Sequence, residues 1–264
     1  MDPTWSAVAT ARDRGEKVAV ATVIGVNGSS PRSAGARMVV WMDGRIAGTV
    51  GGGHFEKVVI EAAVATLNAG VPRRLAVHLT RDLGMCCGGA MEVFIEPVQP
   101  KQELVIFGAG HVAKSTAAIA REAGWEVRVV DERDEWATID RFPGCTLDLG
   151  DARRVARELS SSSSRYVLIV THDPALDQDL LETIIAKDLA WIGLIGSRAK
   201  VTKFFLRLRA AGIDPAWFGR VSAPVGLDLG AETPAEIAVS ILAELVQVRR
   251  GRVGSAGRMR VIAP

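Results

Sequence analysis

The chain has 264 residues, of which 48% are hydrophobic and 23% are charged, so it can form one large domain or two ordinary ones with a buried core. Its formal net charge of +2 is too small to produce the positive field that general nucleic-acid binding requires. No apolar stretch is long enough to span a bilayer, so the composition predicts neither a nucleic-acid nor a membrane partner.

The cysteine content indicates the compartment. Three cysteines, two of them adjacent, do not form the pattern of a disulfide framework. The first residues, 1–5, also lack the basic flank and apolar run of a secretory signal peptide. Both observations fit a reducing environment, and we expect the protein to be cytoplasmic.

The first part of the chain alternates short apolar segments with glycine-rich turns. The predicted elements are a helix at 3–14, a strand at 17–26, a hairpin at 37–42 and 45–50, a helix at 54–67 and strands at 74–79 and 90–95. Asp43-Gly44 between the two hairpin strands is a strong turn signal. These elements predict a small α+β domain, which we place at residues 1–98.

From residue 99 the pattern changes to strand, glycine turn and helix in alternation. The predicted strands lie at 103–107, 125–130, 166–170, 191–195 and near 221, and the helices at 112–123, 174–187, 198–211 and 234–249. Such alternation predicts a parallel sheet covered by helices on both faces. We place this second domain at residues 99–264.

Three short patterns refine the second half. Two prolines among polar residues mark 97–102 as a linker, and the five consecutive serines at 160–164 indicate a loose surface loop. Thr233, Pro234 and Glu236 have the spacing of a capping box at the start of the last helix.

A glycine turn follows the first strand of the second domain. Gly108, Gly110 and His111 belong to a G-x-G-x-x-A pattern that lies after a strand and before a helix. Such a turn lets a phosphate approach backbone N–H groups, and Asp131 at the end of the next strand is placed to contact ribose hydroxyls. The sequence therefore predicts a Rossmann-like domain, with either a bound nucleotide or a turn that serves only the fold.

His172 is the one plausible proton-relay residue for a nicotinamide enzyme, because it follows a strand at the ligand-binding edge. In the alternative interpretation, Asp173 and Pro174 cap the next helix and His172 is exposed. The sequence leaves both alternatives open.

The turn Cys86-Cys87-Gly88-Gly89 is an unusual feature of the N-terminal domain. Successive backbone N–H groups in such a turn can stabilise a thiolate and a neighbouring anion. A thiolate is also a soft metal ligand, so Cys87 is the candidate metal contact and Cys86 the second choice. Zinc fits poorly because there is no C-x-x-C pair, and an inert turn remains the alternative.

Two further loops of this domain are candidate anion sites. Gly52, Gly53 and His54 open a helix, where N–H groups and the helix dipole favour a negative charge. Ser30 and Arg32 add a hydroxyl and a fixed cation suited to a phosphate. Each loop taken alone could also be a simple tight turn.

Seven blocks of the sequence together resemble one known family. They are Gly28-Ser29-Ser30-Pro31-Arg32, Gly51-Gly52-Gly53-His54-Phe55-Glu56, Cys86-Cys87-Gly88-Gly89, Gly108-Ala109-Gly110-His111-Val112, Thr171-His172-Asp173, Leu194-Ile195-Gly196-Ser197 and Gly226-Leu227-Asp228-Leu229-Gly230-Ala231-Glu232-Thr233-Pro234. By these blocks the chain resembles the xanthine dehydrogenase accessory protein family, XdhC/CoxI. The triple glycine with His54 and the cysteine pair look like the XdhC branch, whereas the last block looks more like the CoxI branch.

The resemblance implies a function. Such proteins bind molybdenum cofactor, protect it while a cysteine desulfurase supplies the terminal sulfido ligand, and deliver it to an apo molybdenum hydroxylase of the xanthine dehydrogenase type. It also implies a homodimer, and a maturation factor rather than a turnover enzyme. An NAD(P)-dependent oxidoreductase built on the glycine turn is the main alternative, and a scaffold for the hydroxylase that binds no ligand is a third.

Overall fold

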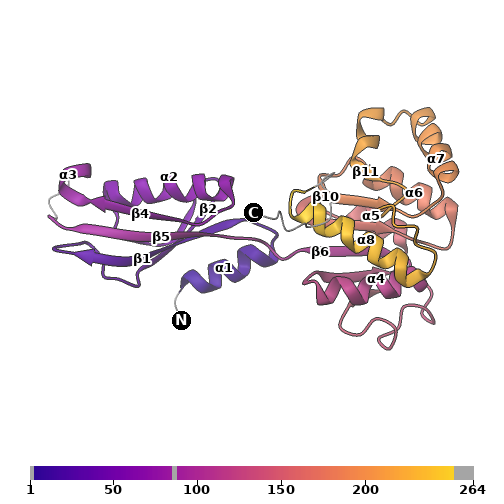
Figure 1. Ribbon diagram of the computed structural model, residues 1–264, viewed down its shortest axis with the longest axis horizontal. Helices are drawn as coiled ribbons and strands as arrows, with labels where there is room; N and C mark the ends of the chain where they lie inside the picture. The colour runs from indigo at the N-terminus through magenta and orange to yellow at the C-terminus, as the bar shows by residue number, and fades with distance from the viewer. Residues whose placement is uncertain (1–2, 85–87, 253–264) are drawn as a thin grey trace, which may run out of the picture. The chain divides into compact units, whose positions relative to one another are not determined.

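The computed structural model describes residues 3–84 and 88–252. The chain divides into two compact units, Met1–Lys101 and Gln102–Pro264 (Figure 1). We keep the domain boundary between residues 98 and 99 as a proposal, because the last strand of the first unit ends at Val98. None of the helices in the described residues is long and apolar enough to cross a membrane.

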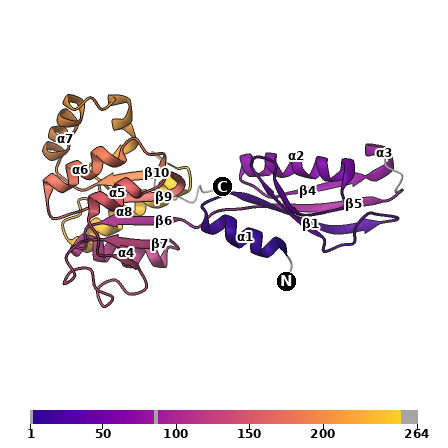
Figure 2. The same cartoon turned by 180° about the vertical axis from the view of Figure 1, so that it is seen from behind.

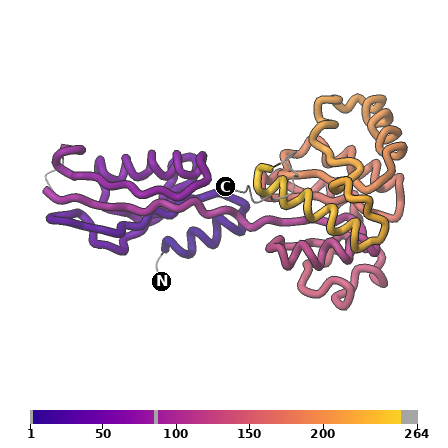
Figure 3. Tube along the Cα trace, in the orientation of Figure 1, coloured from indigo at the N-terminus to yellow at the C-terminus, as the bar shows by residue number. Residues whose placement is uncertain are grey.

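The N-terminal unit is an antiparallel sheet with helices on both faces. Its elements are α1 (Pro3–Asp13), β1 (Val18–Asn27), β2 (Arg37–Trp41), β3 (Ile46–Gly48), α2 (Gly53–Ala69), β4 (Arg73–His78), α3 (Leu79–Leu83) and β5 (Ala90–Val98). The strand order is β3-β2-β1-β5-β4. Figure 3 shows β1 and β5 running side by side, and their register extends from Val18 paired with Val98 to Asn27 paired with Ala90.

Hydrophobic spacing explains why the helices cover this sheet. Phe55, Val59 and Ala63 recur every fourth residue along α2, and all three are fully buried against one face of the sheet. On the opposite face, Val8 and Ala11 of α1 pack in a second cluster with β1 and β2 (Figure 2). Alternation along the strands supplies both faces, because successive side chains point to opposite sides.

The predicted linker at 97–102 begins too early. Strand β5 continues through Pro97, which pairs with Ala19 of β1. Pro97 lies beyond the last pair between β5 and β4, which joins Ile95 to Arg73. This part of β5 therefore has a neighbour on one side only, where a proline is tolerated.

The C-terminal unit is a parallel sheet between two helical layers. Its elements are β6 (Glu103–Phe107), α4 (His111–Glu122), β7 (Glu126–Val130), β8 (Thr146–Asp148), α5 (Ala152–Glu158), β9 (Ser162–Ile169), α6 (Pro174–Ile184), β10 (Leu189–Leu194), α7 (Arg198–Ala210), the 3-10 helix η1 (Pro215–Arg220), β11 (Val221–Ser222) and α8 (Pro234–Arg249). The strand order is β11-β10-β9-β6-β7-β8, the doubly wound order of a Rossmann fold. The chain direction across the sheet reverses between β6 and β9, where such folds bind ligands.

Two hydrophobic clusters hold the helices on this sheet. Helices α4 and α8 pack on one face, and α5, α6 and α7 pack on the other. The capping box predicted at the start of α8 is confirmed: Thr233 accepts a hydrogen bond from the Glu236 N–H, and Glu236 accepts one from the Thr233 N–H. Ile241 and Leu245 of α8 are fully buried.

The surface loop predicted at 160–164 is confirmed only for Ser160 and Ser161, which are exposed and lie outside any strand, and is wrong for Ser162–Ser164. Strand β9 begins at Ser162, and Ser164 is only 4% exposed. The N–H of Ser162 donates to the Asp188 carbonyl oxygen at 2.8 Å, and the hydroxyls of Ser162 and Ser164 are hydrogen bonded to each other. Asp188, directly before β10, and the pairing of Ser162 with Leu189 of β10 hold this end of the strand, and serine propensity does not predict such contacts.

Candidate functional site

Two of the N-terminal motif loops lie directly against each other. A Cβ atom added at Gly89 would lie 2.6 Å from the Asn27 carbonyl oxygen and closer still to that of Ser29. One added at Gly28 would lie 3.2 Å from the Gly89 Cα atom. Only glycines allow this backbone approach, so the Gly28 loop and the Gly88-Gly89 turn form one surface at the end of the β1–β5 ladder.

The triple-glycine turn joins the same cluster. A Cβ atom at Gly51 would lie 2.6 Å from the Pro31 Cγ atom, so the turn packs against the loop that carries Ser30 and Arg32. We call Gly28–Arg32, Gly51–His54 and Gly88-Gly89 together the N-terminal loop cluster. Three motifs that are distant in the sequence therefore meet within one unit.

A carboxylate from the chain partly closes the triple-glycine turn. All three glycines have positive φ, between 63° and 144°, a conformation that side chains other than glycine rarely adopt. Glu56 of α2 accepts hydrogen bonds from the N–H groups of Val50 and Gly52, at 3.2 and 3.3 Å, and from the Thr49 hydroxyl. The Glu56 carboxylate thus occupies part of the position at which the sequence predicted an external anion.

Other groups of the cluster remain available. The Arg32 guanidinium is exposed and has no acceptor among the residues that the structure describes. The Ser30 hydroxyl donates to the Arg32 carbonyl oxygen at 2.9 Å, which stabilises the loop, and His54 is exposed. Cys86 and Cys87 lie outside the described residues, although the sequence joins Cys87 directly to Gly88.

In the C-terminal unit, the glycine turn lies at the switch point of the sheet. A Cβ atom at Gly108 would lie 2.5 Å from the Val170 carbonyl oxygen, which follows β9. The turn after β6 and the turn after β9 are therefore in backbone contact. Gly110 differs, because a Cβ atom there would meet nothing within 4 Å.

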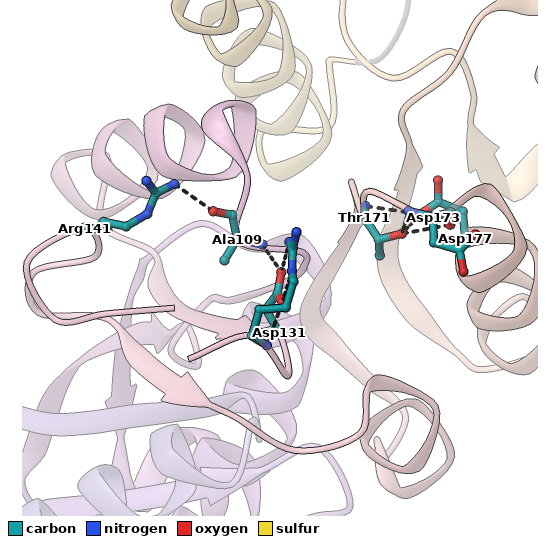
Figure 4. A network of polar contacts seen from close by, with 7 residues as sticks. Ala109, Asp131, Arg141, Thr171, Asp173 and Asp177 are labelled. Atoms are coloured by element: carbon teal, nitrogen blue, oxygen red, sulfur yellow. Dashed lines mark hydrogen bonds and ion pairs between the residues drawn. The ribbon is translucent and has the colours of Figure 1, made fainter. Parts of the chain in front are cut away.

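Asp131 is placed beside this turn but is already hydrogen bonded. Its carboxylate accepts from the Ala109 N–H at 2.7 Å and from the backbone N–H and guanidinium of Arg133 at 2.6 to 3.1 Å (Figure 4). Burial alone would raise the pKa of Asp131, but the hydrogen bonds from Arg133 and Ala109 outweigh it and hold that pKa below its usual value. A ribose contact would require Arg133 to move.

Two arginines and a tryptophan cover the same turn. Arg141 donates to the Ala109 carbonyl oxygen at 3.0 Å, and its guanidinium lies 4.7 Å from the centre of the Trp136 ring. Arg133 lies 5.2 Å from the same ring, and His111 contacts it edge-on at 5.6 Å. His111 is thus an exposed ring packed on Trp136.

A buried polar network beyond β9 was missed from the sequence. Asp177 is fully buried and accepts from the Thr171 hydroxyl at 2.7 Å and from the Lys200 ammonium at 2.6 Å. Lys200 also donates to the Ile195 carbonyl oxygen at 3.2 Å, so the network connects the loops after β9 and β10. The sequence did contain a signal for this network, because Asp177 and Lys200 lie in the first turns of α6 and α7, which follow the carboxyl ends of the parallel strands β9 and β10.

His172 stands outside this network. It is exposed, whereas Asp173 caps α6 by accepting from the Ala175 N–H at 2.8 Å and Pro174 begins the helix. These contacts match the helix-capping alternative for this segment.

The cleft beside the glycine turn is narrow. The pocket that Gly108, Asp131 and His172 line has a volume of about 20 Å³, whereas small-molecule sites commonly enclose at least about 300 Å³. In residues 3–84 and 88–252, no three His, Cys, Asp or Glu side chains gather into a metal site.

Comparisons with known proteins agree with this architecture. A family model described as the XdhC Rossmann domain matches residues 104–245, and one described as the XdhC and CoxI family matches residues 11–79. A solved structure from Bacillus halodurans described as a xanthine dehydrogenase covers 96% of this chain and 97% of its own, with 23% identity and a TM-score of 0.52. At that identity the likeness supports the fold alone.

Three curated proteins are related in sequence. The uncharacterized protein YqeB of Escherichia coli is 38% identical over 242 residues, which are 89% of this chain and 44% of YqeB. A Bacillus subtilis protein described as a probable xanthine dehydrogenase component is 35% identical over 159 residues, which are 60% of this chain and 46% of that protein. The molybdenum cofactor insertion chaperone PaoD of E. coli is 20% identical, over 89% of this chain and 84% of PaoD.

The chain therefore spans less than half the length of the first two of these relatives. The two family models together cover most of residues 11–245, in the order that the seven sequence blocks predict. With its antiparallel N-terminal unit and Rossmann unit, this chain belongs to the XdhC and CoxI family.

Proposed function

We propose that this protein is a maturation factor that binds molybdenum cofactor as cargo and delivers it to an apo molybdenum hydroxylase of the xanthine dehydrogenase type. Membership of the family and similarity to the insertion chaperone PaoD support the assignment. While bound, the cofactor is protected and receives its terminal sulfido ligand from a cysteine desulfurase. The work takes place in the cytoplasm, where thiols stay reduced, and the protein acts as a homodimer.

The observation that carries the proposal is the meeting of three motif loops in the N-terminal unit. Glycine contacts hold Gly28–Arg32, Gly51–His54 and Gly88-Gly89 together, and the Arg32 guanidinium beside them has no protein acceptor in the described residues. A free guanidinium pairs well with a phosphate, such as the one that the pterin of the cofactor carries. In this proposal Cys87, bonded to Gly88, contacts the metal as a soft ligand, and Cys86 is the second choice.

The oxidoreductase alternative has weaker support. A nicotinamide dinucleotide would need the ribose contact that Arg133 now makes with Asp131, and a cleft much larger than about 20 Å³. The histidine that could relay a proton is exposed, at a helix-capping segment. These contacts favour a carrier, which must bind and release its cargo, over an enzyme with an acid–base pair.

A transfer experiment tests the proposal. Protein purified without oxygen and loaded with cofactor is mixed with apo-hydroxylase, and the active sites gained are counted per cofactor supplied. We expect stoichiometric transfer, one active site for each loaded protein. If the protein leaves the hydroxylase inactive and instead turns over NAD(P) and a small substrate at about 1 per second or faster, the oxidoreductase replaces the carrier.

The thiol role has its own test. Cys87→Ala should lower the cofactor retained after gel filtration while the melting temperature stays unchanged, because the role proposed for this thiol is to bind the metal. Cys145→Ala is the matched control, since Cys145 belongs to the C-terminal unit. Equal cofactor content in all three proteins would exclude Cys87 as a ligand. Light scattering of the same samples tests the homodimer.

A further inference from the structure

Helix α7 of the C-terminal unit concentrates one sign of charge. It contains five lysines and arginines and no aspartate or glutamate, although the whole chain has 30 acidic residues beside 32 basic ones. The net charge of the chain is only +2, so the bias is a local property of this helix. Figure 1 shows α7 on the outside of its unit.

Four of the five basic side chains are exposed, and they form two rows. Arg198 and Arg209 lie about three helical turns apart on one edge of the exposed surface, and Lys203 and Arg207, at i and i+4, lie on the other edge. Leu206 lies between the rows and is 62% exposed. We call these five residues the basic face of α7.

The opposite side of α7 is anchored in the fold. Val201, Phe204 and Leu208 are buried, and the Phe205 ring stacks on that of Phe218 in η1, with the ring centres 4.7 Å apart. The helix is therefore held in place, and its large apolar side chains other than Leu206 are already packed. A helix that binds in a membrane surface needs such side chains free to enter the lipid, so this packing argues against a membrane role.

The charge of the basic face is not compensated within the described part of the chain. In residues 3–84 and 88–252, its four cationic side chains have no hydrogen bond or ion pair. The nearest acidic residues along the chain have other partners, since Asp214 caps η1 and Asp188 pairs with Arg220. Lys200, the fifth basic residue of α7, differs because it pairs with the buried Asp177.

This arrangement of cations also destabilises the helix that carries it. Arg198 begins α7, where the helix dipole disfavours positive charge, and the first turn has no acidic residue, whereas α6 and α8 have Asp177 and Glu236 there. Lys203 and Arg207 are like charges at i and i+4, which repel each other. A local conflict without compensation inside the fold is typical of a surface that serves binding.

The pattern of the basic face indicates the kind of partner. Two rows of cations around one exposed leucine suit a protein surface with carboxylates on both sides of a small apolar contact. Nucleic acid suits it less well, because Leu206 in the middle of the face would lie against phosphates. Charged surfaces mainly raise association rates, which suits a carrier that must find its client and then leave it.

We propose that the basic face of α7 docks an acidic surface of the apo-hydroxylase that receives the cargo. The inference rests on the proposed function, which names this client. Docking and cargo binding use different parts of the chain, because the N-terminal loop cluster belongs to the first unit and α7 to the second. A variant of the basic face therefore changes delivery without changing cargo retention.

Binding of the full-length, loaded protein to immobilised apo-hydroxylase tests the docking surface. Biolayer interferometry at about 50 mM and about 300 mM salt separates charge effects from apolar ones. Lys203→Gln combined with Arg207→Gln should lower the affinity at least tenfold at the lower salt concentration, mainly through the association rate, and should reduce the salt dependence. Leu206→Ser should weaken binding at both salt concentrations.

Two further double variants are controls. Arg12→Gln with Arg157→Gln neutralises two exposed arginines in the last turns of α1 and α5 and should bind like wild type. Lys203→Arg with Arg207→Lys keeps both charges and should retain the affinity. The melting temperature of the Lys203→Gln, Arg207→Gln protein should not fall, because the variant removes a repulsion and no contact.

Three results would overturn the proposal. The first is equal affinity of wild type and the Lys203→Gln, Arg207→Gln variant at the lower salt concentration. The second is an equal loss of affinity in the Arg12→Gln, Arg157→Gln control, which would make the effect one of net charge. The third is tighter binding of wild type to duplex DNA, or to phosphatidylcholine vesicles with about 30% phosphatidylserine, than to the hydroxylase.

Cofactor transfer separates this inference from the proposed function. We expect the Lys203→Gln, Arg207→Gln variant to retain as much cofactor as wild type, to transfer it at least tenfold more slowly to limiting hydroxylase, and to reach the same yield with excess hydroxylase. If both proteins transfer equally fast, the carrier stands and the docking surface fails. If the hydroxylase binds through the basic face but gains no active sites, the docking surface stands and the carrier fails.

Discussion

The two glycine turns of the molecule have similar sequences but different surroundings. Both precede a helix, at Gly51–Gly53 and at Gly108–Gly110, and in both a carboxylate of the chain takes backbone N–H groups. Glu56 comes from the first turn of the same helix, whereas Asp131 comes from the end of the neighbouring strand and carries Arg133 with it. A glycine turn before a helix is therefore an external anion site only where the chain leaves N–H groups unfilled.

The two turns also differ in whether the arginines near them are already hydrogen bonded. In the N-terminal unit the turn packs against the Gly28–Arg32 loop, and Arg32 of that loop has no acceptor in the described residues. In the C-terminal unit both nearby arginines are engaged, Arg133 with Asp131 and Arg141 with Ala109. Cations that are free to pair, rather than the glycines themselves, distinguish the two regions.

The largest expected effect is that of Gly89→Ala, which breaks the contact between the motif loops. The new Cβ atom would overlap two carbonyl oxygens, so the free energy of unfolding of the N-terminal unit should fall by about 3 kcal/mol, and cofactor retention should fall with it. Gly88→Ala is the matched control, since a Cβ atom there meets nothing within 4 Å. Thermal unfolding measures the stability of the two variants. Equal losses of stability in Gly89→Ala and Gly88→Ala would contradict the close packing of the two loops.

Gly108→Ala applies the same comparison to the second turn. Its φ of 109° and the close Val170 oxygen predict a loss of about 2 kcal/mol in unfolding free energy. Gly110→Ala adds a Cβ atom in open space, at an ordinary φ of −69°, and should leave stability unchanged. Weaker binding of any ligand to Gly110→Ala, measured by calorimetry, would show that the turn does bind an anion.

Asp131→Asn tests whether the Asp131 carboxylate stabilises the Gly108–Gly110 turn by accepting from the Ala109 N–H. Because the pKa of Asp131 is lowered in the fold, its ionised form stabilises the protein above the ordinary aspartate pKa near 4, and that stabilisation is lost as the pH falls through the lowered value. We expect Asp131→Asn to cost about 2 kcal/mol at pH 7 and less below about pH 4. Asp134→Asn, at an exposed aspartate, is the control. Urea unfolding between pH 7 and below about pH 4 measures the difference in unfolding free energy between wild type and Asp131→Asn. A difference that does not change with pH would contradict a stabilising role of the ionised Asp131 carboxylate.

Arg32→Gln sharpens the comparison with the smallest change in stability. The guanidinium is exposed and has no acceptor among the described residues, so the melting temperature should not shift. Cofactor retention should fall about tenfold, roughly 1.4 kcal/mol, if Arg32 binds the cargo phosphate. Arg12→Gln on α1 serves as the control, and retention that is equal in both variants would remove Arg32 from the site.

Local patterns in the sequence were enough to predict most of the fold. The change from glycine-rich hairpins to alternating strands and helices near residue 99 predicted an α+β unit before a Rossmann-like unit, and both sheets have those forms. The capping box at Thr233 was also predictable, because short-range hydrogen bonds determine it. The sequence also named the motif residues of both units as candidates, since their residue types carry recognisable chemistry, whereas the Asp177–Lys200 network was not among those candidates.

Contacts between distant segments decided the rest. Ser162–Ser164 became part of β9 because Ser162 pairs with Leu189 of β10, and Pro97 remained in β5 because it lies beyond the last pair between β4 and β5. The meeting of Gly28 with Gly89, the capture of the Ala109 N–H by Asp131 and the burial of Asp177 with Lys200 each join residues from different elements. Local propensity does not predict contacts between residues that are distant in the sequence. The sequence therefore identified the candidate groups, and the packing of the strands and helices decided which of them contact each other and which stay free to bind.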